Sequence, residues 1–188
     1  MVREHPQWDY LRNAVDEGRT GEIRNIQVSY SHTVESNHDI RIQADASGGA
    51  LMDVGCYASA IVRLLMAEPP HRVWAHMQRD SATSVDLHTQ ALLDYGDAVA
   101  QLSASIAASR HQQLTVVGTT GWARVEVPFA HLDTLSARIA FGTNTAPGTE
   151  ATEVVRFAPA NQYQLQAERF ARRIRGKAMR HYPPTDGI

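Results

Sequence analysis

Cysteine and lysine are scarce in this chain of 188 residues, which has a single Cys56 and, among 18 basic residues, a single Lys177. One cysteine excludes an internal disulfide and a multi-cysteine metal cage, and it favours a reducing, cytoplasmic location. The apolar runs are too short to span a bilayer. Met1 is followed by Val-Arg-Glu-His-Pro rather than by a secretory leader, so we expect neither membrane insertion nor secretion.

Several motifs of nucleotide binding and catalysis are also absent. The glycines never occur as G-x-G-x-x-G or G-x-x-x-x-G-K-[ST], and no G-x-S-x-G is present. The nine histidines lack H-x-x-x-H spacing, so we expect surface or strand positions for them and no metal site. The net charge of −2 and the lack of a basic stripe argue against a nucleic-acid partner.

What the sequence does contain is typical of a folded domain, with 43% hydrophobic and 20% charged residues. The length fits one domain, residues 1–188, that can bury a substantial core. Helical spacing and period-two alternation predict a helix, a strand, a helix, a long run of strands and a final helix. Consecutive strands without intervening helices predict an α+β fold with a large, mostly antiparallel sheet.

The predicted boundaries follow from proline, glycine and turn residues. The predicted helices cover 6–18, 48–68 and 161–176, and the predicted strands cover 23–30, 72–79, 86–94, 98–107, 112–118, 122–127, 134–141 and 152–157. The turn at Tyr95-Gly96-Asp97 makes 86–107 a predicted hairpin, and 34–47 and 142–149 are predicted loops. In the last helix, Leu165, Phe170 and Ile174 are expected to face inward.

The most informative segment is GGALMDVGCYASAIVR, which begins at Gly48. Asp53 and Tyr57 are four apart and therefore share a helix face. Gly55 between them costs a helix about 1 kcal/mol relative to alanine, so something is expected to pack close to the backbone there. Gly48 and Gly49 are expected to leave free N–H groups toward an anion or ligand. Asp53 and Tyr57 either point into a ligand pocket or are a capping or surface Asp beside a half-buried Tyr. The residue pattern alone favours the second alternative.

A family resemblance favours the ligand-pocket alternative for Asp53 and Tyr57. The segment resembles G-G-[GA]-x-L-x-D-x-G-x-[HY], which opens a helix in the C-terminal domain of the glucose–fructose oxidoreductase / inositol dehydrogenase (Gfo/Idh/MocA) family. The Tyr form, LMDVGCY, is similar to the branch of dihydrodiol and sugar dehydrogenases. GEIRNIQVSY, VDLHTQALLDYGDAVAQLSAS, VVGTTGWARVEVPF and NQYQLQAERFARRIRG with YPPTDGI resemble other parts of that domain in the same order. The resemblance implies a glyceraldehyde-3-phosphate dehydrogenase-like open sheet with helices packed on one face.

The resemblance also implies roles for particular residues. Tyr57 corresponds to the residue that donates or accepts the substrate proton, and Asp53 to an acidic partner that orients substrate or Tyr57. Arg41 lies where related enzymes place an arginine near the substrate. Asn161 and Tyr163 either face the substrate cleft or only begin the last helix, and the second alternative is favoured. The two glycines, Gly48 and Gly49, would lie beside the nicotinamide and are predicted cofactor contacts.

The chain departs from the family in lacking the nucleotide-binding half. Tyrosine, with a pKa of about 10, is a poor base near pH 7 unless a cation stabilises the phenolate. In the family that cation is a lysine of an E-K-P motif in the N-terminal domain, whereas Lys177 follows the last helix.

The resemblance therefore predicts the substrate-binding and oligomerisation domain of an NAD- or NADP-dependent oxidoreductase that acts on a sugar, polyol or dihydrodiol hydroxyl. We expect this chain alone to be inactive and to bind neither cofactor tightly. Its expected partners are the missing nucleotide-binding domain and, through the sheet, further copies of itself. The alternative is a stand-alone, non-catalytic module for ligand binding or oligomerisation.

Overall fold

A computed structural model describes residues 2–36, 38–130, 134–145 and 150–177. Seven residues of the predicted exit, YPPTDGI, lie outside the described residues. The short helices are η1 (Val2–Glu4), η2 (Ile40–Ile42) and the π-helical η3 (Leu51–Gly55), and the α-helices are α1 (Pro6–Asp16), α2 (Cys56–Met66) and α3 (Gln162–Ile174). The strands are β1 (Ile23–Thr33), β2 (Arg72–Arg79), β3 (Asp86–Asp94), β4 (Val99–Ser105), β5 (Ala107–Gly118), β6 (Gly121–Val125), β7 (Ala137–Thr143) and β8 (Glu153–Phe157).

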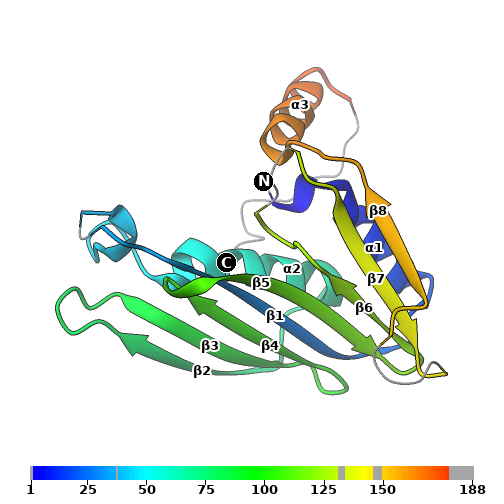
Figure 1. Ribbon diagram of the computed structural model, residues 1–188, viewed down its shortest axis with the longest axis horizontal. Coiled ribbons are helices and arrows are strands. Elements are labelled where there is room, and N and C mark those ends of the chain that lie inside the picture. The colour runs from blue at the N-terminus through cyan, green and yellow to red at the C-terminus, as the bar shows by residue number, and fades with distance from the viewer. Residues whose placement is uncertain (1, 37, 131–133, 146–149, 178–188) are drawn as a thin grey trace.

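All eight strands form one open sheet in the order β2-β3-β4-β1-β5-β6-β7-β8 (Figure 1). β1 and β4 are parallel, and every other neighbouring pair is antiparallel. The predicted hairpin is present, since β3 and β4 pair with Leu93 opposite Ala100. The predicted α+β architecture with a mostly antiparallel sheet is confirmed.

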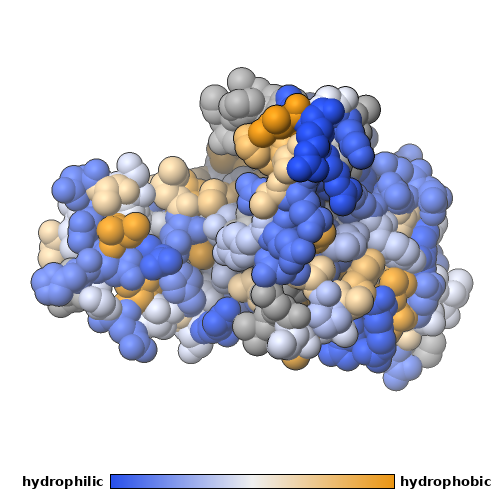
Figure 2. Space-filling view, turned by 90° about the horizontal axis from the view of Figure 1, so that it is seen from above, coloured by the Kyte–Doolittle hydropathy of each residue, from blue (hydrophilic) through white to orange (hydrophobic). Residues whose placement is uncertain are grey.

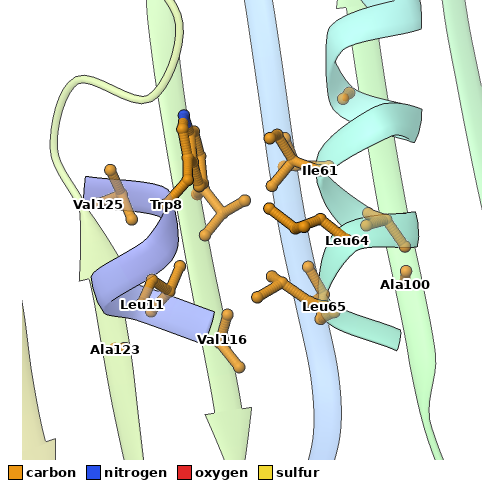
Figure 3. Close-up of a cluster of buried hydrophobic side chains, with 14 of the residues drawn as sticks. Trp8, Leu11, Ile61, Leu64, Leu65, Ala100, Val116, Ala123 and Val125 are labelled. Atoms are coloured by element: carbon orange, nitrogen blue, oxygen red, sulfur yellow. The ribbon is translucent and has the colours of Figure 1, made fainter. Parts of the chain in front are cut away.

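Helices α1 and α2 cover one face of the sheet and form the main core with it (Figure 3). Trp8 and Leu11 of α1 and Ile61 of α2 are completely buried, as helical spacing predicted for the first two. The strand residues beneath them are small or β-branched, including Ile26, Val28, Ala100, Val116, Ala123, Val125 and Ile139. None of the helices in the described ranges has both the length and the apolar character to span a membrane.

Several predicted boundaries differ from the structure, and β1, for example, continues to Thr33 rather than ending at residue 30. The helix expected from Gly48 begins only with η3, which passes into α2, and β5 begins at Ala107 rather than at residue 112. β7 runs to Thr143, although Gly142 was assigned to a loop. The indole of Trp122 lies where a Cβ of Gly142 would stand, so this glycine is required by close packing within the sheet rather than by a turn.

The inward orientation expected of the last helix is wrong for two of three residues. Leu165 is partly buried, but Phe170 and Ile174 are 65% and 71% exposed. The reason is that α3 stands beside the sheet and contacts η1, where Arg169 forms a 2.6 Å ion pair with Glu4. Figure 2 looks onto this end of the molecule and shows hydrophobic surface exposed beside hydrophilic side chains. Phe170 and Ile174 thus form an apolar stripe on α3 that the described residues do not cover.

One histidine belongs to the core rather than to the surface expected for it. His5 is the N-cap of α1, where its Nδ1 accepts a 3.3 Å hydrogen bond from the backbone N–H of Gln7, and Pro6 follows at the first helical position. Only 1% of His5 is exposed. Burial lowers the pKa of this imidazole to about 4, so it is neutral in the folded protein near pH 7.

Acidification is expected to destabilise the protein through His5. Between its unfolded pKa of about 6.5 and its folded pKa of about 4, only the unfolded chain binds the proton, so stability falls as the pH falls. This contribution is on the order of 2–3 kcal/mol. His5→Asn retains an N-cap acceptor. Urea unfolding at pH 7 and pH 4.5 should show a smaller loss in His5→Asn than in wild type. His76→Asn, at an exposed β2 position, should behave like wild type. Equal losses in all three proteins would contradict the assignment.

Candidate functional site

A cleft of about 490 Å³ opens beside η3, at the end of β1. Side chains from β1, β5, η2, η3, α2, the segment after β6 and the start of α3 line it. These residues are Val2, Tyr30, His32, Thr33, Arg41, Asp53, Val54, Tyr57, Arg110, Phe129, Ala130, Gln162 and Tyr163. Aromatic rings and charged groups thus share one cleft, which suits a ligand with both an apolar ring face and hydroxyl groups.

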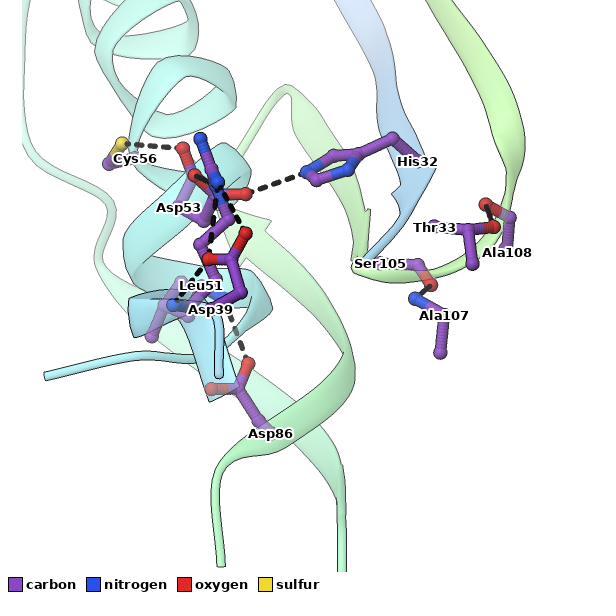
Figure 4. A network of polar contacts seen from close by, with 11 residues as sticks. His32, Thr33, Asp39, Leu51, Asp53, Cys56, Asp86, Ser105, Ala107 and Ala108 are labelled. Atoms are coloured by element: carbon purple, nitrogen blue, oxygen red, sulfur yellow. Dashed lines mark hydrogen bonds and ion pairs between the residues drawn. The ribbon is translucent and has the colours of Figure 1, made fainter. Parts of the chain in front are cut away.

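The carboxylate of Asp53 is held on both oxygens (Figure 4). Oδ2 lies 2.7 Å from Nε2 of His32, and Oδ1 accepts a 3.0 Å hydrogen bond from Nε of Arg41. The same guanidinium reaches Asp39 at 3.0 Å through a terminal nitrogen. The hydrogen bond to Asp53, together with the charge of that carboxylate, raises the pKa of Arg41, so the arginine stays protonated. Asp53 is therefore held in a fixed position between His32 and Arg41.

Tyr57 lies one turn after Asp53 and faces the same cleft. Its ring centroid is 6.3 Å from that of Tyr30 and 6.4 Å from that of Phe129. Burial is the main cause that raises the pKa of the Tyr57 phenol, and the charge of Asp53 adds to it. The structure thus holds Tyr57 as a neutral phenol near pH 7, able to donate a hydrogen bond or a proton.

The start of this helix is held in place by close backbone packing. A Cβ on Gly55 would lie 3.2 Å from the Cβ of Ala104 on β4, which confirms that a neighbour packs tightly there. The N–H of Leu51 donates a 2.8 Å hydrogen bond to the buried carboxylate of Asp86 on β3. The neighbouring strands therefore fix the position from which Asp53 and Tyr57 project.

The free N–H groups expected at the two glycines are a wrong prediction. Gly48 donates to the carbonyl of Gln43 at 2.9 Å, and Gly49 donates to that of Arg41 at 2.8 Å. A Cβ at Gly48 would lie 2.5 Å from the Arg41 oxygen, and Gly49 has a φ of +118° with Asp86 beside it. These glycines let the η2 loop approach the helix, which brings Arg41 to Asp53. Their N–H groups are therefore not available to a cofactor, which removes that reason for predicting Gly48 and Gly49 as cofactor contacts.

Of the six predicted site residues, three meet in the cleft, and three, Gly48, Gly49 and Asn161, are not among the residues that line it. Asp53, Tyr57 and Arg41 all line it, whereas Asn161 caps α3 by accepting hydrogen bonds from the N–H groups of Tyr163 and Gln164, both at 3.0 Å. The sequence left two positions open for Asn161, and the structure gives it the helix-starting one.

Tyr163, for which the helix-starting position was favoured, lines the cleft. Most of the other cleft residues were missed, among them Tyr30, His32, Arg110 and Phe129. Alternation along β1 carries a signal for two of them, because Val28, Tyr30 and His32 fall on one face of the strand. Arg110 and Phe129 carry no such local signal.

Three glutamines clamp the irregular segment that carries Phe129. Oε1 of Gln112 accepts hydrogen bonds from the backbone N–H groups of Phe129 and Ala130, at 2.8 and 3.0 Å. Gln162 donates to the carbonyl of Phe129 at 3.2 Å, and Gln7 donates to the preceding carbonyl at 3.3 Å. These bonds replace the ladder that a strand would supply, so the Phe129 ring is held against Tyr57.

Removing the acceptor of Gln112 should destabilise the protein. Gln112→Leu leaves two partly buried N–H groups without their partner, and we expect it to lower the free energy of unfolding by about 2–3 kcal/mol. Gln112→Glu keeps the acceptor oxygen and should lose less. Gln101→Leu, at an exposed position of β4, should change stability by about 0.5 kcal/mol or less. Chemical denaturation measures all three, and equal effects of the leucine and glutamate variants at 112 would contradict the clamp.

Solved oxidoreductases share this fold. A 3-ketoreductase from Actinomadura kijaniata in complex with NADP and TDP-benzene superposes with a TM-score of 0.83 at 24% identity, over 99% of this chain and 56% of the other. An aldose-aldose oxidoreductase from Caulobacter crescentus, complexed with glycerol, gives a TM-score of 0.82 at 20% identity, over 99% of this chain and 55% of the other.

Sequence comparison identifies the family. The model of the GFO/IDH/MocA C-terminal domain matches residues 8–124, so the chain belongs to the Gfo/Idh/MocA oxidoreductase family. It is 35% identical to an uncharacterized oxidoreductase of Rhizobium meliloti, over 93% of this chain and 53% of that protein. It is 30% identical to D-xylose 1-dehydrogenase (NADP(+)) 2 of Haloferax volcanii, over 93% and 52%. The chain thus spans about half the length of these curated relatives.

Proposed function

We propose that this chain is the substrate-binding and oligomerisation domain of an NAD(P)-dependent oxidoreductase that acts on a hydroxyl group of a sugar, polyol or dihydrodiol. The observation that carries this proposal is the half-buried Tyr57 beside the doubly bonded Asp53 in an aromatic cleft. Membership of the family and relatives named as sugar and dihydrodiol dehydrogenases support it. The single cysteine supports a cytoplasmic setting.

The residues of the cleft fit a substrate rather than a dinucleotide. The chain has no G-x-G-x-x-G, and the N–H groups of Gly48 and Gly49 are bonded to carbonyls. The proposal therefore assigns the cofactor to a separate nucleotide-binding domain, and this chain alone is expected to be inactive and to bind neither NAD nor NADP tightly. The exposed apolar stripe of α3, beside the cleft, is the surface proposed to meet that domain.

Tyr57 is the proposed proton carrier at the substrate oxygen. As a neutral phenol it donates a proton when a carbonyl is reduced; in the reverse direction its phenolate accepts the proton of the alcohol. Arg41 and His32 hold Asp53, and Tyr30 and Phe129 limit the access of water to the ring. Because burial raises the pKa of Tyr57, the phenolate requires a cation from elsewhere. Lys177 is exposed beyond the end of α3, so the proposal places that cation in the nucleotide-binding domain.

The coding sequence upstream of residue 1 provides the first test. The proposal expects an open reading frame with G-x-G-x-x-[GA] and E-K-P there. Without such a frame, the chain would be a stand-alone ligand-binding or oligomerisation module.

In the protein with its nucleotide-binding region, Tyr57→Phe should reduce kcat by roughly 10²–10⁴-fold with a smaller change in KM, because the variant retains the ring and loses the proton. Tyr95→Phe, whose ring packs in the main core, serves as the control and should retain activity. Steady-state kinetics with NADH and NADPH measure both variants. Unchanged turnover in Tyr57→Phe would remove this residue from the mechanism.

We also propose that the open face of the sheet forms a subunit contact. This face is hollowed, and its lining combines amide and hydroxyl side chains with the exposed rings and methyl groups of Trp74 and Leu92. Trp74 and Leu92 are paired in register on β2 and β3, where they are 53% and 44% exposed. Apolar groups at the centre of a polar rim are typical of protein interfaces.

Trp74→Glu should shift an oligomer toward monomer, because it places a charge at the centre of the proposed contact. Val73→Glu is the matched control, since Val73 is also exposed on β2 but points to the opposite face. Light scattering over a range of concentrations measures the mass. A wild-type protein that is strictly monomeric would refute this contact.

A further inference from the structure

A β-bulge interrupts the pairing of β1 and β5 at the edge of the cleft. Ser31 pairs with His111, and Thr33 pairs with Ala107. Two steps along β1 therefore correspond to four steps along β5, so β5 carries two additional residues at this point. Bulges of this kind redirect side chains and are frequent beside active sites.

Two hydroxyl groups of β1 hold the bulge. Oγ of Ser31 donates a 2.7 Å hydrogen bond to the carbonyl of Ser109, and Oγ1 of Thr33 donates a 3.0 Å hydrogen bond to that of Ala108. The second contact is drawn in Figure 4. The carbonyls of the added residues are thus satisfied by side chains, and the bulge has a defined conformation.

The bulge carries Arg110, which lines the cleft with Tyr30 and His32. Its positive charge opposes the effect of burial on the pKa of the Tyr30 phenol, which indicates that the guanidinium lies near that ring. Arg110 is exposed and forms no hydrogen bond or ion pair with the part of the chain that the structure describes. Arg41 differs, because its charge is met by Asp39 and Asp53.

We propose that Arg110 binds an anionic substituent, a carboxylate or a phosphate, on the substrate that occupies this cleft. This inference rests on the proposed function, since it specifies the substrate class of the same site. A guanidinium presents parallel N–H donors that match either group, and no carboxylate among the described residues pairs with that of Arg110. Asp53 also lines this cleft, but its two carboxylate oxygens are bonded to His32 and Arg41, so Arg110 is not drawn to it.

The test is an NMR titration of the ¹⁵N-labelled 188-residue chain with D-glucose, D-glucuronate and D-glucose 1-phosphate. The wild-type chain should bind the two anionic sugars about tenfold or more tightly than glucose, with shifts at the Tyr57 and Arg110 amides. Arg110→Gln should weaken binding of the anionic sugars about tenfold and leave glucose unchanged. Arg156→Gln removes the same charge from an exposed position on β8, outside the cleft, and should change none of the three. The sugar that loses more affinity in Arg110→Gln identifies the preferred anion.

Two results would overturn the inference, and they differ in what they say of the proposed function. Equal affinity of all three sugars, unaffected by Arg110→Gln, would refute the anion site and leave a sugar-binding cleft in place. No shift of the cleft amides by any of the three sugars would refute both the anion site and a sugar as the proposed substrate.

Discussion

The position of Phe129 is the constraint on which the rest of the cleft depends. Its ring stacks on Tyr30, with centroids 5.1 Å apart, and also faces Trp8 of the core and Tyr57 of the cleft. Phe129 lies outside the strands of the described residues, and glutamine side chains from α1, β5 and α3 satisfy the backbone around it. Because buried polar groups require partners and aromatic rings require dense packing, the core and the cleft are built as one unit.

β1 connects the same two regions along a single strand face. Its inward residues pass from Ile26 and Val28 in the core to Tyr30 and His32 in the cleft. The strand lies in the middle of the sheet, parallel to β4 and antiparallel to β5, so its position is set by both neighbours. Asp53 is consequently held by a histidine on a rigid strand and by an arginine on a loop, which is a more precise arrangement than two loops would provide.

Local patterns were sufficient for the order of elements and the type of sheet, whereas the grouping of Asp53, Tyr57 and Arg41 was expected only from the family resemblance. Periods of two and of about 3.6 residues are properties of short windows, and the motif that contains Asp53 and Tyr57 is contiguous. Arg110 and Phe129 could not be found in this way, because a bulge and a clamped segment are defined by pairing between distant strands. The apolar residues of α3 were misplaced for a related reason: helical spacing identifies an apolar face but not what covers it.

The charges in the cleft are consistent with the proposed function, in which this chain binds the substrate and a second domain supplies the cation. Arg41 is neutralised by two carboxylates, and the pKa of Tyr57 is raised by burial and by the nearby charge of Asp53. This chain alone therefore favours the neutral phenol, which suits ordered binding and disfavours proton abstraction near pH 7. A cation that arrives with a second domain would lower the phenol pKa only when both domains close on a substrate. Under that arrangement, the raised pKa of Tyr57 would keep the base inactive until the site is complete.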